Sequence, residues 1–541
     1  MSSEIQHVKS RCGGGKTQRT IEYLYPFITG NPDEKVIFSS KTKKLTDQSF
    51  KNFKSRAHQV ADSQIALQRI DTDTVSASSS VRRELDAWLD QQEGGVIFTS
   101  HAALRKIDPE KLQNVRLIID EVPDNLVKHV RVSYEYKDNG SSWETLIKTE
   151  FCPGTQYQKV TLDPSASRKE VRRRIDNIRS GIDNSVTREV AELLEFLLAG
   201  HEVMYTTAQQ TNGKVMSFYL ATDWEQLENL VTHSKQMAIL SSQLRDTLVG
   251  FVLGKVMGTP IVETQIDSEV TLETHHAARA VIYPLVEGNR WSSSFKRANA
   301  NERLSYWGKA VASTQPVGLY AQQVAQDILQ GRPTLLILNT KDPEHECWEG
   351  YPYKRITSAA HGQNDHTDYH HATFLSSNRP DKYETHALKL FARSHGLCPD
   401  EIIQTVLRER CHETAYQCIA RSSVRNPKTG PETQHTLVVP DEAHAEYIAG
   451  WFEPGMATID RTYMHQQRST TVSEERNEAV FNLIVKIRTE YLAGEAPLKD
   501  LRQKYGLDAK KYQRYVNKFR ATLEPAGLMA RKGLRTTLSR T

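Results

Sequence analysis

A glycine-rich segment near the start of the 541-residue sequence constrains the fold more than any other feature. Residues 10–17 read Ser-Arg-Cys-Gly-Gly-Gly-Lys-Thr, between a strand candidate at residues 5–8 and a helix-like stretch at residues 18–25. Glycines let backbone N–H groups close around phosphate oxygens, a lysine reaches the terminal phosphates, and a threonine hydroxyl binds magnesium. The segment predicts a phosphate loop; a glycine-rich turn ahead of a helix is the alternative. The predicted nucleotide-binding residues are Ser10, Gly13, Gly14, Gly15, Lys16 and Thr17.

Two acidic residues end an apolar strand candidate further along the chain. Residues 117–119 read Leu-Ile-Ile and are followed by Asp120 and Glu121. In a phosphate-loop enzyme, Asp120 and Thr17 would hold a magnesium ion, and Glu121 would orient or deprotonate the attacking water. An acidic pair at the end of a strand is common and often lies in a solvated turn. The pair therefore indicates a function only in combination with the phosphate loop. Together the two segments predict hydrolysis of a nucleoside triphosphate.

Short apolar runs alternate with helix-compatible stretches in two parts of the chain, which is typical of parallel sheets covered by helices. In the first part the strand candidates are residues 36–38, 96–99 and 117–119; in the second they are residues 280–283, 334–338, 372–375 and 436–439. Between the two parts the pattern is mixed, with a strand-like stretch at residues 130–136, a turn at residues 138–140 and a basic helix near residues 168–179. We interpret this mixed region as an insertion.

The composition is that of an ordinary globular protein. The sequence has 70 Lys and Arg against 66 Asp and Glu, and 38% hydrophobic residues, with a mean hydropathy of -0.56. These values exclude collagen-like and mucin-like chains. No apolar stretch reaches the roughly 20 residues of a membrane helix, and no secretory signal is recognisable. We therefore expect no membrane partner and a cytoplasmic location, either nucleoid-associated or in the cytoplasm of a host.

The C-terminal region concentrates positive charge. Residues 498–541 contain twelve Lys or Arg against three acidic residues, and they read as a helix, a turn centred on Gly506 and a second helix. This helix-turn-helix-like pattern favours contact with duplex DNA, although RNA or a protein would also suit a basic helical domain. Tyr512, Val516 and Phe519 recur at helical spacing and fit a core better than a stacking role. The expected nucleic-acid contacts are Lys510, Lys511, Arg514 and Lys518.

Taken in order, these segments resemble the superfamily 2 helicases of the DEAD/DEAH-box type. The phosphate loop looks like their first motif, and residues 120–123, Asp-Glu-Val-Pro, stand in the place of the acid box, with Val-Pro departing from both named forms. Residues 38–48 and 97–104 are similar to the family segments that touch the nucleic-acid backbone. The contacts that the resemblance implies there are Ser40, Lys41, Thr99, Ser100 and His101.

Later segments continue the resemblance. Ser241, Ser242 and Gln243 are similar to the Ser-Ala-Thr segment that couples hydrolysis to strand movement. Residues 335–342 and 358–365 look like the fourth and fifth motifs. They imply nucleic-acid contacts at Asn339 and Thr340 and coupling roles for Gly362 and Asp365.

The sixth motif is matched by its spacing. Gln417, Arg421 and Arg425 follow the pattern Gln-x-x-x-Arg-x-x-x-Arg. At that spacing we expect the three residues to share one face of a helix that points at the cleft between two domains. Arginines from a second domain neutralise charge that develops on a transferred phosphoryl group. A surface helix with two basic residues is the alternative if the motif stood alone.

The resemblance implies an α/β fold with two tandem RecA-like parallel-sheet domains, an insertion and a small all-α C-terminal domain. The expected boundaries are residues 1–124 with 234–273 for the first domain, 125–233 for the insertion, 274–460 for the second domain and 473–541 for the helical domain. The implied activity is that of a nucleic-acid-stimulated ATPase, a helicase or translocase with ATP and Mg2+ as cofactors. Its expected partner is DNA rather than RNA, with replication or repair proteins as further partners.

Two other functions stay open. The same motor would suit an RNA helicase or remodeller, and a motor that has lost hydrolysis would suit a non-catalytic DNA-binding regulator. A metal cluster at the histidine-rich residues 361–371 is not expected, because the stretch already matches a helicase motif and has no cysteine nearby.

Overall fold

The computed structural model describes residues 4–57, 65–76, 78–123, 127–134, 143–151, 158–183, 188–200, 202–209, 215–222, 224–265, 272–358, 366–426, 429–468, 471–523 and 528–529. The chain divides into two compact units. One comprises Met1–Ala298 and Gln315–Met464, and the other comprises Asn299–Thr314 and His465–Thr541. None of the helices in the described residues has the length and apolarity needed to cross a lipid bilayer.

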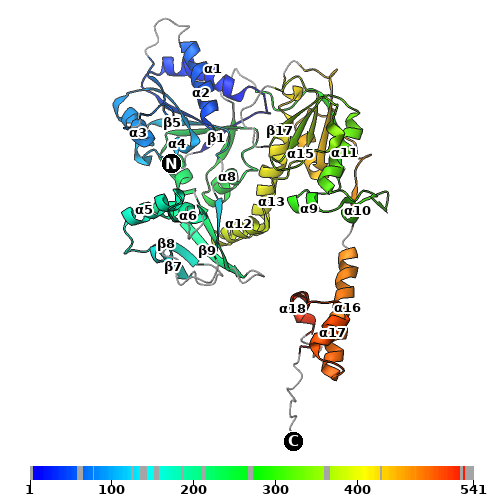
Figure 1. Cartoon of the computed structure of the whole chain (residues 1–541). Helices are drawn as coiled ribbons and strands as arrows, with labels where there is room; N and C mark the ends of the chain where they lie inside the picture. Colours follow the sequence, from blue (N-terminus) through cyan, green and yellow to red (C-terminus); the bar gives the residue numbers. More distant parts are fainter. Residues whose placement is uncertain are drawn as a thin grey trace. The chain divides into compact units, whose positions relative to one another are not determined.

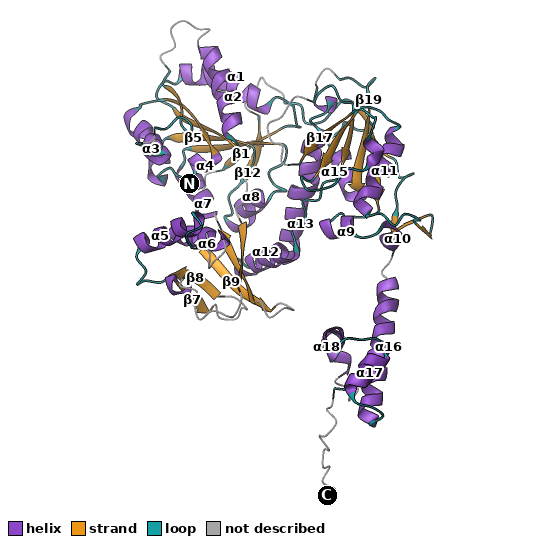
Figure 2. Ribbon diagram, in the orientation of Figure 1, coloured by secondary structure: helices purple, strands orange, loops and turns teal. Residues whose placement is uncertain are grey.

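A seven-stranded sheet with parallel pairing throughout forms the first part of the larger unit (Figures 1 and 2). In spatial order its strands are β12 (Ile261–Thr264), β1 (Ile5–Lys9), β11 (Gln236–Ser241), β5 (Val115–Asp120), β2 (Lys35–Ser40), β4 (Gly95–Ser100) and β3 (Leu67–Arg69). Ile37, Phe38 and Phe98 are fully buried, as expected for strands that helices cover on both faces. Because β1, β11 and β5 are parallel neighbours, the residues that follow them meet at one edge of the sheet.

The helices of this part follow the strands in the alternation that the sequence predicts. They are α1 (Lys16–Gly30), α2 (Lys43–Ala57), α3 (Val81–Gln91), α4 (His101–Leu104), α7 (Trp224–His233) and α8 (Leu248–Phe251). Helix α1 begins directly after the glycines and buries Ile21, Leu24 and Ile28 at helical spacing. The phosphate-loop segment therefore joins a central strand to a helix.

The second sheet is also parallel throughout. In spatial order its strands are β17 (Tyr353–Thr357), β16 (Thr334–Leu338), β18 (His371–Phe374), β19 (Gln434–Asp441), β13 (Arg279–Val286) and β20 (Ala457–Ile459). Helices α9 (Ser293–Arg297), α11 (Val317–Leu329) and α15 (Glu442–Ala449) accompany it. The strand predictions at 280–283, 334–338, 372–375 and 436–439 are confirmed. The ends of the observed strands differ from the predicted ends by at most three residues. The expected α/β fold class with two parallel sheets is thus confirmed.

An antiparallel sheet stands between β5 and β11 in the chain. Its order is β6 (Val127–Tyr134), β10 (Val215–Thr222), β9 (Glu202–Gln209), β8 (Gln158–Leu162) and β7 (Ile147–Phe151). The predicted basic helix is confirmed as α5 (Arg168–Arg179), which packs beside α6 (Arg188–Leu198) through Val171, Ile175 and Leu194. The turn expected at residues 138–140 lies outside the described residues.

A run of helices lies between β18 and β19, where the sequence predicts only a helix at residues 417–425. It comprises α12 (Lys382–Ser394), α13 (Pro399–Leu407), a π-helical segment (Arg408–Glu413) and α14 (Thr414–Ile419). Leu388, Phe391 and Val406 share a hydrophobic core with Leu248 and Val252 of the first α/β part. These helices therefore connect the second sheet to the first.

The smaller unit combines a short antiparallel sheet with helices. Strands β14 (Leu304–Tyr306), β15 (Lys309–Ala310) and β21 (Gln466–Gln467) form the sheet. Helices α16 (Thr471–Ala493), α17 (Leu498–Lys504), α18 (Ala509–Lys518) and α19 (Arg520–Leu523) form a core around Ile484, Ile487, Leu501, Tyr512 and Val516. The turn between α17 and α18 uses Gly506 at φ 67°. The core positions of Tyr512 and Val516 agree with the sequence prediction.

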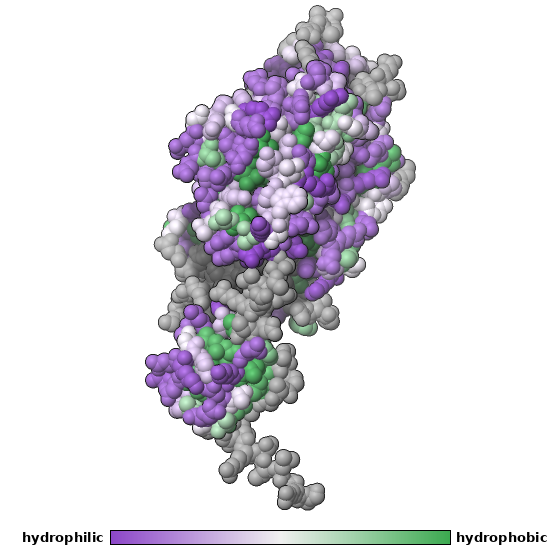
Figure 3. Space-filling model, turned by 90° about the vertical axis from the view of Figure 1, so that its right-hand side faces the viewer, coloured by the Kyte–Doolittle hydropathy of each residue, from purple (hydrophilic) through white to green (hydrophobic). Residues whose placement is uncertain are grey.

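Hydrophilic side chains predominate on the face of the larger unit that Figure 3 presents, and apolar side chains occur there in small scattered patches. Such scattering is ordinary for a protein surface.

Candidate nucleotide-binding cleft

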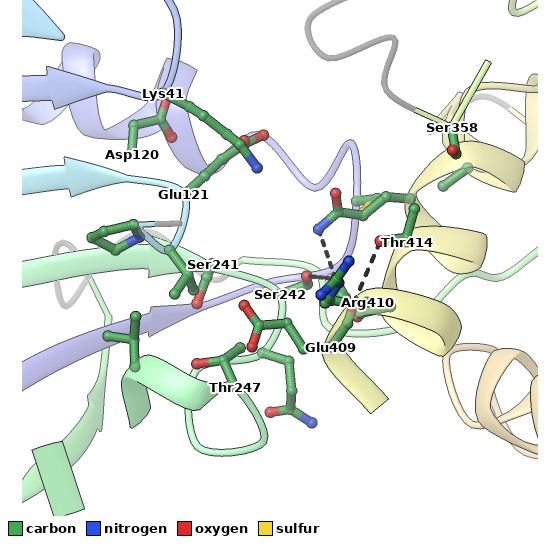
Figure 4. A pocket seen from close by; sticks show the side chains of 18 of the residues that line it. Lys41, Asp120, Glu121, Ser241, Ser242, Thr247, Ser358, Glu409, Arg410 and Thr414 are labelled. Carbon is green, nitrogen blue, oxygen red and sulfur yellow. Dashed lines mark hydrogen bonds between the residues drawn. The ribbon is translucent and has the colours of Figure 1, made fainter. Parts of the chain in front are cut away.

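A cleft of about 1040 Å³ lies within the larger unit, between the carboxyl edge of the first sheet and the helices that precede β19. Figure 4 shows Asp120, Glu121 and Ser241 on one wall and Arg410 and Thr414 on the facing wall. The residues that line the cleft include Gly13, Gly15, Lys16, Thr17, Asp120, Glu121, Ser242, Glu413, Gln417, Arg421 and Arg425.

The three glycines of the phosphate loop each meet a steric requirement. Gly13 and Gly15 have φ values of 77° and 85°, in the left-handed region that favours glycine. A Cβ atom on Gly14 would lie 2.1 Å from the Ser10 Oγ atom. The Lys16 Nζ atom donates hydrogen bonds to the carbonyl oxygens of Ser10 and Arg11, both at 3.1 Å. The backbone carbonyl oxygens of the loop therefore hold the Lys16 ammonium group in place.

Asp120 lies at the end of β5 and contacts the start of α1. The Thr17 hydroxyl donates to Asp120 Oδ1 at 2.8 Å. Burial and the adjacent Glu121 raise the pKa of Asp120 to about 7, against the hydrogen bond from Thr17 and the charge of Lys16. A buried carboxylate beside a second carboxylate is stabilised by a nearby cation, and carboxylate and hydroxyl oxygens are ligands that Mg2+ accepts. Thr17 and Asp120 thus fit a divalent cation.

Glu121 has an unusual backbone. Its φ value is 70°, a left-handed conformation that costs a residue other than glycine about 1 to 3 kcal/mol. The Glu121 N–H group donates to the Leu240 carbonyl oxygen at 2.9 Å, which ties this turn to the neighbouring strand β11. Figure 4 shows the Glu121 side chain on the wall of the cleft. Backbone strain at a cleft residue is a feature that functional sites often carry.

The sixth-motif residues reach the cleft, but the prediction that they share one helical face is wrong. Helix α14 ends at Ile419, and Ser423–Arg425 form a 3-10 turn. The Ser423 N–H group donates to the Tyr369 carbonyl oxygen at 2.9 Å, a partner outside the helix, so the chain leaves the helical path before Arg425. Gln417, Arg421 and Arg425 nevertheless all line the cleft.

The two arginines differ in their surroundings. Arg421 is 6% exposed, and its Nη1 atom has no hydrogen-bond partner among the described residues. A buried guanidinium nitrogen without a partner is costly unless a ligand satisfies it. Arg425 packs on the phosphate loop, because a Cβ on Gly13 would lie 2.2 Å from Arg425 Cγ. Basic groups of the second α/β part therefore stand at the phosphate loop of the first.

Glu413 is a buried acceptor that the sequence analysis missed. Its carboxylate is 6% exposed and accepts hydrogen bonds from the Ser242 hydroxyl, from Gln417 Nε2 at 3.0 Å and from the Tyr447 hydroxyl at 2.5 Å. Burial and the Glu413 charge raise the Tyr447 pKa, so the phenol stays a donor. Glu413 therefore joins the predicted coupling segment to the sixth motif. Its only sequence signal is a position one helical turn before Gln417.

A second polar connection joins the phosphate loop to α14. The Cys12 N–H group donates to the Tyr416 oxygen at 2.9 Å, and this oxygen lies 3.0 Å from His276 Nε2. Burial lowers the His276 pKa to about 3, so its imidazole is neutral near pH 7. Burial also raises the Tyr416 pKa, which keeps the phenol protonated. Tyr416 can then accept from Cys12 and donate to His276.

Some of the residues predicted to contact nucleic acid or to couple hydrolysis to movement are buried, and others line the cleft. Ser40 and Thr99 are fully buried, and Thr99 donates to the Ile70 carbonyl oxygen at 2.6 Å. Ser100 caps α4, and His101 is 7% exposed. Lys41 lines the cleft, together with Ser241 and Gln243. Their predicted contacts with nucleic acid or roles in coupling stay predictions.

Other predicted residues that the structure describes do not line this cleft. Asn339, after β16, accepts from Lys296 Nζ at 3.0 Å and donates to the Ser377 carbonyl oxygen at 3.2 Å, and Thr340 follows it. Lys510, Lys511, Arg514 and Lys518 are exposed on α18. Gly362 and Asp365 lie outside the described residues. The described part of the chain holds no group of three or more His, Cys, Asp or Glu that would suit a metal ion.

No protein-family model matches the sequence, and no curated protein matches it. Some solved structures are similar to the chain. The structure titled XPD_APO has 12% identity and a TM-score of 0.44, over 84% of this chain and 97% of that one. Dbp5 of S. cerevisiae, bound to RNA and ADP BeF3, has 11% identity and a TM-score of 0.34, over 85% and 86% of the two chains.

A further structure is the DUF1998 helicase MrfA bound to DNA and AMPPNP, with 10% identity and a TM-score of 0.34, over 85% of this chain and 50% of that one.

Proposed function

We propose that the chain is an ATP-dependent nucleic-acid motor, a helicase or translocase that acts on DNA in preference to RNA. One observation carries the proposal. A single cleft collects the ammonium of Lys16, the acids Asp120 and Glu121, and the guanidinium groups of Arg421 and Arg425. Cations on both sides of an acidic pair are what a triphosphate with its metal ion requires.

The residues of the cleft have distinct roles in this proposal. Lys16 and the loop amides bind the phosphates, and Thr17 and Asp120 hold Mg2+, which supplies charge neutralisation. Glu121 orients the attacking water. Arg421 and Arg425 neutralise charge on the transferred phosphoryl group from the opposite wall. Because the walls belong to different sheets, hydrolysis would change how the two sheets are held together.

Charge distribution supports a polyanionic partner. The smaller unit carries 18 Lys or Arg against 9 Asp or Glu, so the rest of the chain is net negative although the whole chain is +4. On α18, Lys510, Lys511, Arg514 and Lys518 are exposed while Tyr512 and Val516 are buried. A basic exposed face on a helix that follows a tight turn suits phosphate and groove contacts with duplex DNA.

The test is steady-state ATP hydrolysis by the purified full chain, alone and with single-stranded DNA, duplex DNA or RNA. We expect turnover that DNA stimulates more than RNA and that Lys16→Ala abolishes. Greater stimulation by RNA would select the RNA remodeller instead. Binding to DNA without turnover under any condition would select the non-catalytic regulator.

A further inference from the structure

A β-hairpin in the smaller unit presents an exposed tryptophan at its tip. Strands β14 and β15 pair with Ser305 opposite Ala310 and Tyr306 opposite Lys309, so Trp307 and Gly308 form a two-residue turn. Trp307 is 84% exposed, the largest fraction among the large hydrophobic side chains of the described residues. A side chain of this size usually gains stability by burial. At 84% exposure most of that gain is forgone, and the ring keeps only an edge contact with the Tyr306 ring, at 6.0 Å between the ring centroids, among the described residues.

The backbone at the tip adds a second cost. Trp307 and Gly308 have φ values of 51° and 76°, so both central residues of the turn are left-handed. Turns of this kind favour Asn, Asp or Gly at the first central position, because a bulky side chain is strained there. Tryptophan at this position is thus unfavourable both for the backbone of the turn and because its apolar ring is exposed to water. Folding of the hairpin does not explain why a tryptophan is present.

The base of the hairpin is well anchored, which leaves the tip as a rigid projection. Leu304 and Val311 are buried, and β14 pairs with β21 through Leu304 and Ser305. The Tyr306 ring lies 5.1 Å from the buried His465 ring. The tip therefore holds the indole outward on a fixed support.

Two cations flank the tip. Arg303 precedes β14 and Lys309 follows the turn, and both are exposed. Neither forms a side-chain ion pair or hydrogen bond with any residue that the structure describes. An exposed indole between two available cations matches the pattern of single-strand recognition, in which an aromatic ring stacks on a base while cations contact the adjoining phosphates.

We propose that Trp307 is a stacking site for an unpaired base of a single-stranded nucleic acid, with Arg303 and Lys309 contacting the flanking phosphates. This inference rests on the proposed function, because it requires a nucleic-acid track. It adds a binding site outside the nucleotide cleft. A protein surface would also accept an exposed indole, but the two cations favour a polyanion.

The test is binding of the full chain to a fluorescent 20-nucleotide oligo-dT and, separately, to a blunt duplex, across a range of salt concentrations. We expect Trp307→Asn to weaken single-strand binding about 5- to 100-fold, the usual effect of losing one stacked base. Duplex binding and ATP turnover without nucleic acid should not change. Trp307→Phe should keep most of the affinity, and Trp307→Leu should not.

The choice of Trp307→Asn separates stacking from folding. Asn suits the left-handed position better than Trp, so this variant should keep or raise the melting temperature. Arg303→Ala and Lys309→Ala should instead lower the slope of log affinity against log salt, by about 0.7 for each lost phosphate contact. Phe151→Ala removes another exposed aromatic ring and serves as the control that should bind normally.

Three outcomes would overturn the inference. Wild-type affinity in Trp307→Leu and Trp307→Asn would exclude stacking while leaving the motor proposal intact. Equal losses on single strand and duplex would indicate a contact that does not read unpaired bases. A wild-type chain that binds neither nucleic acid would overturn this inference and the nucleic-acid motor together.

Discussion

The wall of the cleft that the first sheet provides is made of strand ends, whereas the facing wall is made of helix ends and a π-helical turn. On the first wall, Lys16 and Thr17 come shortly after β1, and Asp120 ends β5, a parallel strand of the same sheet. On the second wall, Glu413 ends the π-helical segment, and Arg421 lies between the end of α14 at Ile419 and the 3-10 turn Ser423–Arg425. Strand ends are fixed by sheet register, while helix termini depend on their tertiary partners. The first wall is therefore the more predictable of the two.

The arginines of the second wall offer the largest expected effect. Arg421→Ala should lower ATP turnover by about 10³-fold or more while retaining nucleotide binding, because it removes a cation that acts on the transferred phosphoryl group. Turnover and binding of a fluorescent nucleotide would be measured side by side, with Arg461→Ala as an exposed control. Normal turnover in Arg421→Ala would remove Arg421 from the mechanism.

Glu121 tests the first wall. Glu121→Gln keeps the shape and the backbone turn but removes the negative charge, so ATP should still bind while hydrolysis falls by about 10²- to 10⁴-fold. Single-turnover hydrolysis with excess protein would isolate the chemical step, and Glu110→Gln, a charge loss on an exposed helical turn, would serve for comparison. A hydrolysis rate close to wild type would remove Glu121 from the mechanism.

Glu413 tests whether the two walls act together. A carboxylate is an acceptor only, so it fixes the Gln417 amide with Nε2 toward Glu413. Glu413→Gln removes this constraint, and we expect kcat to fall about tenfold with little change in KM for ATP. Glu401→Gln, an exposed residue on α13, is the matched control. An increase in KM alone would instead indicate a role in nucleotide binding.

The contact between Tyr416 and His276 should give a smaller, pH-dependent effect on stability. His276 has a folded pKa of about 3 against 6.5 unfolded, so the unfolded chain binds more protons between these values. Its contribution to the unfolding free energy is complete above pH 6.5 and is lost as the pH falls toward 3. Denaturant unfolding from pH 7 to pH 4 should show a shallower loss in His276→Gln than in wild type. Identical pH slopes would contradict the assignment.

The sequence by itself determined the first wall. Residues 10–17 and 117–121 combine a local apolar strand with the polar residues that follow it, and parallel strands bring such ends to one edge whatever the rest of the chain does. The two parallel sheets, the basic helix α5 and the core positions of Tyr512 and Val516 were predictable for the same reason. Each depends on a periodicity that a few neighbouring residues establish.

Only the tertiary structure decided the second wall and the hairpin tip. Ser423 leaves the helical path because its N–H group bonds to Tyr369, far away in the chain, so spacing alone misplaced Arg425 on a helical face. Glu413 gained its donors Ser242 and Tyr447 from separate elements, and no local pattern encodes such a meeting. The exposure of Trp307 likewise depends on where the hairpin is anchored. Contacts between distant segments set these positions, because helix ends and turns have too few local interactions to fix them alone.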